Sequence, residues 1–148
     1  MTTTTMTTAL ETSTTKTATK TTPAFPGGVS GAPRVMLRLE GAAMLIGMLA
    51  LYTHVGASWG LFAALFLAPD LSFAGYLAGP RVGAIAYNAM HGYVGPAIVA
   101  ALSLALAPSL APIAMIWAAH VGFDRMMGYG LKYGTAFGHT HLGTVGKV

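Results

Sequence analysis

Apolar residues dominate the chain from Val35 onward, and they form four long runs separated by short breaks. Each run holds about 20 residues, which at the rise of an α-helix matches the thickness of a lipid bilayer. The pattern therefore predicts four transmembrane helices, over residues 36–55, 59–78, 82–106 and 110–131. The breaks between them are the turns Gly56-Ala57-Ser58, Gly79-Pro80-Arg81 and Ala107-Pro108-Ser109.

Connections this short make neighbouring helices antiparallel, so the predicted fold class is all-α, a four-helix transmembrane bundle with up-down-up-down topology. In lipid, helices approach each other closely where small residues face one another. Gly41, Gly75 and Gly83 are among the residues expected to mediate these contacts.

The first part of the chain does not share this pattern. Residues 1–33 are rich in threonine, and they contain no apolar run that could form a core or a secretory signal. We predict two regions: a disordered Thr-rich tail over residues 1–33, and a membrane domain over residues 34–148 that ends in a glycine-rich tail.

Composition supports a membrane protein. Hydrophobic residues make up 54% of the chain, charged residues only 8%, and the mean hydropathy is +0.62, outside the range of soluble globular domains. There is no cysteine, which excludes disulfides, thiol catalysis and cysteine-ligated zinc. A metal site would have to use His, Asp, Glu or Asn. The expected partner is the lipid bilayer and not nucleic acid, and a homo-oligomer is left open.

Basic residues predict the orientation. Arg34 and Arg38 lie at the start of the first expected helix, Arg81 lies in the second turn, and Lys132 follows the fourth helix, while the other two turns hold no charge. By the positive-inside rule, both termini and the Arg81 turn are expected on the cytoplasmic side.

Among the ionisable residues inside the expected helices, four stand out because an unpaired charge deep in a bilayer costs about 3 kcal/mol or more. Asp70, His91 and His120 come from three different helices, about 9 to 11 residues from their cytoplasmic ends. Asp124 lies one turn nearer the cytoplasm, on the same face as His120. These four residues are the predicted ligands of one site that opens to the cytoplasm.

Two histidines and two aspartates suit zinc or a manganese-like ion, so the leading hypothesis is a metal-dependent hydrolase with a lipid-phase or small anionic substrate. Asn88 is a candidate substrate contact, and Arg125 is a candidate anchor for an anionic group. In the C-terminal tail, His139 and His141 form a second pair that could bind metal, or else belong to a tail anchored at the interface by aromatic residues.

Other readings fit the same residues. His91 and His120 could hold a haem for electron transfer, or the four residues could relay protons in a transport subunit. In a membrane protein without catalytic activity, the histidines would be hydrogen-bond partners between helices, and Asp124 would pair with Arg125 or Lys132.

Several local motifs occur together between about Leu37 and Gly143. They are Ala68-Pro-Asp-Leu-Ser72, Gly75-Tyr-Leu-Ala-Gly-Pro-Arg-Val-Gly83, Tyr87-Asn88 with His91, His120-Val-Gly-Phe-Asp-Arg125, Gly128-Tyr-Gly-Leu-Lys-Tyr133 and Thr140-His-Leu-Gly143. With these motifs the chain resembles the uncharacterised bacterial membrane-protein family catalogued as domain of unknown function 4260. The resemblance implies a small multi-pass protein of the bacterial inner membrane and implies no activity.

A remoter likeness is to the membrane-bound metal-dependent hydrolases. They are similar in the order of Pro69-Asp70, His91, His120 and Asp124, although Ser72 stands where that group has a second aspartate. The likeness implies metal-dependent chemistry and not common descent.

Overall fold

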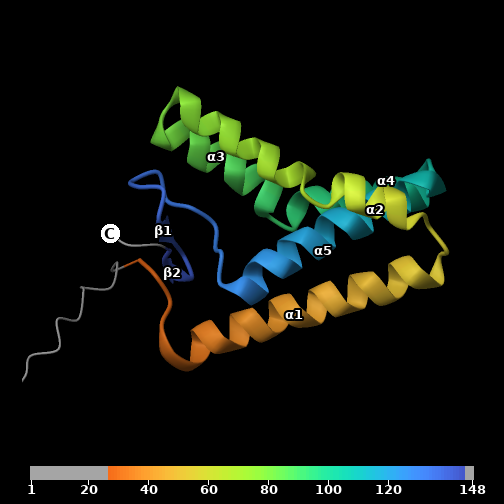
Figure 1. Ribbon diagram of the computed structural model, residues 1–148, viewed down its shortest axis with the longest axis horizontal. Helices are drawn as coiled ribbons and strands as arrows, with labels where there is room; N and C mark the ends of the chain where they lie inside the picture. The colour runs from red at the N-terminus through yellow and green to blue at the C-terminus, as the bar shows by residue number, and fades with distance from the viewer. Residues whose placement is uncertain (1–26, 146–148) are drawn as a thin grey trace, which may run out of the picture.

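The computed structural model describes residues 27–145, and helices account for most of this part of the chain (Figure 1). The elements in chain order are α1 (Gly31–His54), α2 (Trp59–Leu65), the 3-10 helix η1 (Ala68–Ala78), α3 (Pro80–His91), α4 (Val94–Ala105), the short 3-10 helix η2 (Pro108–Leu110), α5 (Ala111–Met127) and the strands β1 (His139–Thr140) and β2 (Gly143–Thr144). The predicted fold class is thus confirmed as a mostly helical one. Most of the predicted Thr-rich tail, residues 1–26, lies outside the described residues, and residues 31–33 belong to α1.

α1 and α5 form the main antiparallel pair of the fold and lie side by side along their length (Figure 1). Their axes approach closely because a glycine of each helix faces the other. A Cβ on Gly122 would lie 2.9 Å from the carbonyl oxygen of Gly41, and a Cβ on Gly41 would lie 2.8 Å from that of Gly122. The expected packing role of Gly41 is therefore visible in the structure.

η1 and α3 form a second antiparallel pair, again across small residues. The ring of Tyr76 lies against Gly83, and Gly75 faces Ala86. α4 packs on α5, so α5 contacts both α1 and α4. This central position is what allows α5 to carry two of the polar residues into the interior.

The third expected helix, 82–106, is divided in the structure, which corrects the prediction. α3 ends at His91, Gly92 has extended backbone, and α4 begins at Val94. Pro96 explains the break, because a proline lacks the N–H that would bond to the carbonyl four residues earlier and its ring clashes with that carbonyl, here on Gly92.

The second expected helix, 59–78, is helical throughout but changes type. α2 ends at Leu65, four residues before Pro69, and the chain continues as the 3-10 helix η1. A 3-10 run of 11 residues is unusually long, and such stretches often mark a hinge or a sequence under strain. Asp70 lies at its start.

Two helical segments of the described chain are long and apolar enough to cross a membrane, Gly31–His54 and Trp59–Ala78, where four were predicted. α3, α4 and α5 are too short to meet this criterion, at 12, 12 and 17 residues. The two long segments are weak evidence for a membrane location, since they qualify by length and composition alone.

The C-terminal segment folds back on the bundle. α5 ends where Gly128 adopts a left-handed conformation, and the backbone N–H of Tyr129 donates to the carbonyl of Asp124 at 2.7 Å. Beyond this cap, β1 and β2 pair as a short antiparallel hairpin close to the start of α1 (Figure 1). The N–H of Val29 donates to the carbonyl of His141 at 2.8 Å, which joins the hairpin to the chain just before α1.

Candidate metal centre

Four side chains that are far apart in the sequence meet between η1, α3 and α5. Asp70 comes from the first turn of η1, His91 is the last residue of α3, and His120 and Asp124 lie one turn apart on α5. Each offers one ligand atom, and these atoms all lie within 4.8 Å of one another. The structure thus brings together the four residues that the sequence predicted to share a site.

Their distances fit a single small cation. His91 Nε2 lies 3.2 Å from Asp70 Oδ1, 3.2 Å from His120 Nε2 and 3.6 Å from Asp124 Oδ2, and His120 Nε2 lies 3.6 Å from Asp70 Oδ1. Metal–ligand bonds of about 2.0 to 2.2 Å around a tetrahedral centre place the ligand atoms about 3.3 to 3.6 Å apart. The cluster needs little rearrangement to surround an ion.

A hydrogen bond to the backbone determines which ring nitrogen of His91 carries a proton. Its Nδ1 lies 2.9 Å from the carbonyl oxygen of Tyr87, which can only accept a hydrogen bond, so Nδ1 carries a proton. The Nε2 atom of a neutral imidazole then presents a lone pair to two carboxylate oxygens. Oxygen and nitrogen lone pairs repel one another, so a proton or a metal ion between these atoms stabilises the cluster. The proton can be one donated by His120 Nε2, which lies 3.2 Å from His91 Nε2.

Tyr87 is the residue of this site that sequence analysis missed. Its hydroxyl donates a hydrogen bond of 3.0 Å to Asp124 Oδ2, and its ring stacks on that of His91 with centroids 3.7 Å apart. The sequence shows Tyr87 as part of a family motif with His91 but gives it no role, and the spacing of four residues places the two on one face of α3. A tyrosine on a helix is too common for this spacing to indicate a site.

Burial is uneven across the cluster. His91, His120 and Asp124 are almost fully buried, whereas the side chain of Asp70 is 36% exposed. Access to the cluster is therefore from the side of Asp70. His120 Nδ1 is a buried ring nitrogen with no hydrogen-bond partner among the described residues, so the orientation of this ring depends on its Nε2 and on the edge of Phe66.

Arg125 and Asn88, the candidate catalytic residues, make backbone contacts in the structure. Arg125 donates to the carbonyl of His91 at 2.8 Å and to that of Tyr129 at 2.7 Å, which stabilises the carbonyl left open where α3 ends. Asn88 donates to the carbonyl of Lys132 at 2.8 Å and accepts from its N–H at 2.7 Å. These contacts hold the broken helix and the tail in place, and a catalytic role for either residue stays an untested prediction.

Lys132 lies in an aromatic cage beside the cluster. Its ammonium donates to the carbonyl of Phe137 at 3.0 Å and lies over the rings of Phe73, Tyr76, Tyr87 and Phe137. Burial lowers the pKa of Lys132 to about 8, against the opposing effect of the negative charge of Asp124. The cage joins the tail to η1 and α3, next to the residues that orient His91.

His139 and His141 lie in the tail and are not members of the four-residue cluster. His141 Nδ1 accepts a hydrogen bond of 2.7 Å from the N–H of Leu131, and His139 Nδ1 lies 3.0 Å from the hydroxyl of Thr135. Metal binding by this second pair stays an untested prediction.

Comparison with known proteins gives a family but no activity. Residues 34–145 match the family described as Domain of unknown function (DUF4260). No curated protein and no solved structure matches the chain. The match covers most of the chain and every residue of the cluster, and it confirms the resemblance seen in the sequence motifs: this protein belongs to the DUF4260 family.

Proposed function

We propose that Asp70, His91, His120 and Asp124 bind one divalent metal ion, zinc or manganese. The observation that carries the proposal is the convergence of four ligand atoms within 4.8 Å, with the His91 Nε2 lone pair directed at two carboxylates. His91 also has the partner that metal-binding histidines usually have, since its other ring nitrogen donates to a carbonyl.

We propose hydrolysis as the chemistry of this centre. A divalent ion supplies two effects there: it lowers the pKa of water and polarises a carbonyl or phosphoryl oxygen. The chain itself fixes the geometry, because Tyr87 orients both His91 and Asp124 while packing keeps His120 in place. The substrate would approach from the side of Asp70, and a lipid-phase ester or phosphoester suits the apolar surroundings.

The geometry of the cluster also bears on two other functions, haem binding and a purely structural metal site. A haem between His91 and His120 is disfavoured, because their Nε2 atoms are 3.2 Å apart and leave no space for a macrocycle. A metal with a purely structural role is favoured by the number of ligands, since structural zinc takes four protein ligands and catalytic zinc usually three. Manganese, with more coordination positions, would leave room for water beside four protein ligands.

We further propose that the protein is a multi-pass protein of the bacterial inner membrane with both termini in the cytoplasm. Exposed apolar side chains support this location, and they occur on the shorter helices as well as on the two long ones. Examples are Ile46 on α1, Ile85 on α3 and Leu104 on α4, which are 66%, 71% and 89% exposed.

The metal proposal is tested by elemental analysis of the detergent-purified protein. Asp70→Asn and His91→Ala should each lose the bound metal while the helical content, measured by circular dichroism, is unchanged. His54→Ala is the matched control, because His54 is an exposed histidine near the end of α1 and should leave the metal content as in the native protein. Metal-free native protein would mean that the cluster is held by a shared proton and would favour the proton-relay reading.

The hydrolase proposal is tested separately on the metal-loaded protein. Cleavage of the generic substrates p-nitrophenyl butyrate and bis-p-nitrophenyl phosphate should stop when a chelator removes the metal and return when the metal is restored. Stable metal binding without cleavage of either substrate class would favour the structural role.

A further inference from the structure

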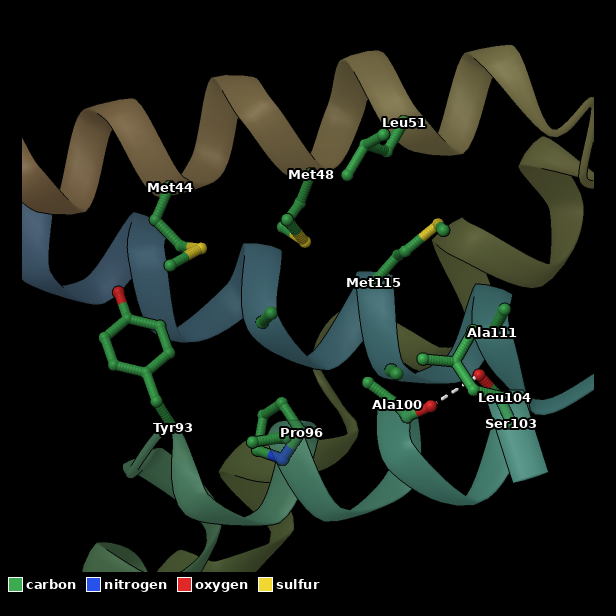
Figure 2. A pocket seen from close by; sticks show the side chains of 13 residues that line it. Met44, Met48, Leu51, Tyr93, Pro96, Ala100, Ser103, Leu104, Ala111 and Met115 are labelled. Atoms are coloured by element: carbon green, nitrogen blue, oxygen red, sulfur yellow. Dashed lines mark hydrogen bonds between the residues drawn. The ribbon is translucent and has the colours of Figure 1, made fainter. Parts of the chain in front are cut away.

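A second site lies away from the metal centre. α1, α4 and α5 surround an elongated cavity of about 350 Å³, with α1 on one side, α4 on the other and α5 between them (Figure 2). None of the four cluster residues lines it. Its volume is within the range of sites that bind small molecules, about 300 to 1,000 Å³.

The cavity is elongated and partly open, and we call it the channel. Tyr93, the residue just before α4, lines one end and Leu104 of α4 lines the other, and the helical rise between them is about 16 Å. An elongated apolar space of about 350 Å³ accepts one unbranched hydrocarbon chain.

The walls of the channel are apolar. The hydroxyl of Ser103, one of its few polar groups, already donates to the carbonyl of Ala100 at 2.7 Å. Among the described residues, no buried polar atom without a partner lines the channel. Water is therefore a poor occupant, since it needs two or more polar partners. Met44, Met48 and Met115 give the walls side chains that adapt to a flexible apolar ligand (Figure 2).

The channel is continuous with an apolar outer surface. Leu51 and Leu104 both line it, and they are also 46% and 89% exposed. α1, which forms one wall, is one of the two segments long and apolar enough to cross a membrane. We propose that this channel binds a single fatty-acyl chain of a bilayer lipid.

The test uses dodecanoate as the probe and the full chain purified in digitonin, a detergent with a rigid steroid body and no unbranched acyl chain. Native mass spectrometry should show one dodecanoate bound per chain, and the ligand should raise the midpoint of thermal unfolding. Ala100→Phe places a ring in the channel and should weaken dodecanoate binding by about tenfold or more. Ala101→Phe is the matched control, because Ala101 is the next residue of α4, is exposed and does not line the channel.

Circular dichroism checks that Ala100→Phe folds, and Ala97→Leu fills the same channel if it does not. Native protein that binds no dodecanoate would overturn the proposal, as would Ala100→Phe protein that binds it like the native chain. A dimer that dissociates with Ala100→Phe and not with Ala101→Phe would also overturn it, since a second copy would then fill the channel. Bound metal should be the same in all these variants, so the result is independent of the metal proposal.

Discussion

Tyr87 connects most of the interactions that shape the candidate metal centre. Its hydroxyl donates a hydrogen bond to Asp124, and its backbone carbonyl accepts one from Nδ1 of His91. Its ring stacks on the ring of His91 and also contacts the ammonium of Lys132. Hydrogen bonds to metal ligands from outside the coordination sphere commonly change metal affinity by about 10- to 100-fold. Tyr87 is therefore a positioning residue whose effect can be separated from packing.

We expect Tyr87→Phe to weaken metal binding by about 10- to 100-fold, because it removes the hydrogen bond to Asp124 and keeps the ring that stacks on His91. The measurement is a competition titration against a chromophoric chelator. The control is Tyr129→Phe, which removes the hydroxyl of an exposed tyrosine just after α5. Equal affinity of the native and Tyr87→Phe proteins would show that Asp124 needs no orienting partner.

For single residues, the sequence predicted which four ionisable side chains come together, but not the side chains that hydrogen-bond to them. Asp70, His91, His120 and Asp124 could be predicted because a charge within an apolar helix costs free energy that something must offset. Tyr87 carries no such cost, so its place in a family motif did not indicate a role at the cluster. Arg125 was predicted to bind an anion, but the break after His91 leaves a carbonyl open, and Arg125 donates to it.

The helices themselves show which sequence signals were decisive. Pro69 lies four residues after the end of α2 and Pro96 five residues after the end of α3, so each break is found about one helical turn before a proline. Both prolines are visible in the sequence, but the apolar residues on either side of each proline favoured the prediction of unbroken helices over 59–78 and 82–106. The end of α5 before Gly128 follows the usual preference for glycine beyond a helix C-terminus. The start of α1 and the end of α5 each differ by a few residues from the prediction.

The contact between α1 and α5 yields a prediction at the scale of the helix. Gly122→Ala should lower the free energy of unfolding by about 1 to 3 kcal/mol, because the new Cβ would lie 2.8 Å from the backbone nitrogen of Leu45 and 2.9 Å from the carbonyl of Gly41. Gly47→Ala is the matched control on α1, since a Cβ there meets nothing within 4 Å and alanine favours helix. Chemical denaturation in detergent micelles measures both, and equal stability of the two variants would contradict the close packing.

For the molecule as a whole, the proposed membrane location has to fit the lengths of the shorter helices. α3 and α4 are each too short to do so alone, yet they follow one another with only Gly92 and Tyr93 between them. A bilayer tolerates such a break where the protein satisfies the backbone, and here Arg125 bonds to the carbonyl of His91 inside the bundle. The sequence predicted the combined length of this third segment and not the break, which places His91 at the end of a helix within the interior.

We therefore expect α3 and α4 to cross together as one interrupted segment, with α5 crossing back. Topology reporters fused after Ser58 and after Pro108 should both read periplasmic, and a reporter after Pro80 should read cytoplasmic, because Arg34, Arg38 and Arg81 favour that side. The Ser58 fusion tests the two long segments alone, since it reads the turn between α1 and α2. The Pro108 fusion decides the rest: a cytoplasmic reading there would mean that only α1 and the segment from Trp59 to Ala78 cross. The exposed apolar residues of α4, with Val94 at 73% and Leu104 at 89%, would then need a cover other than lipid.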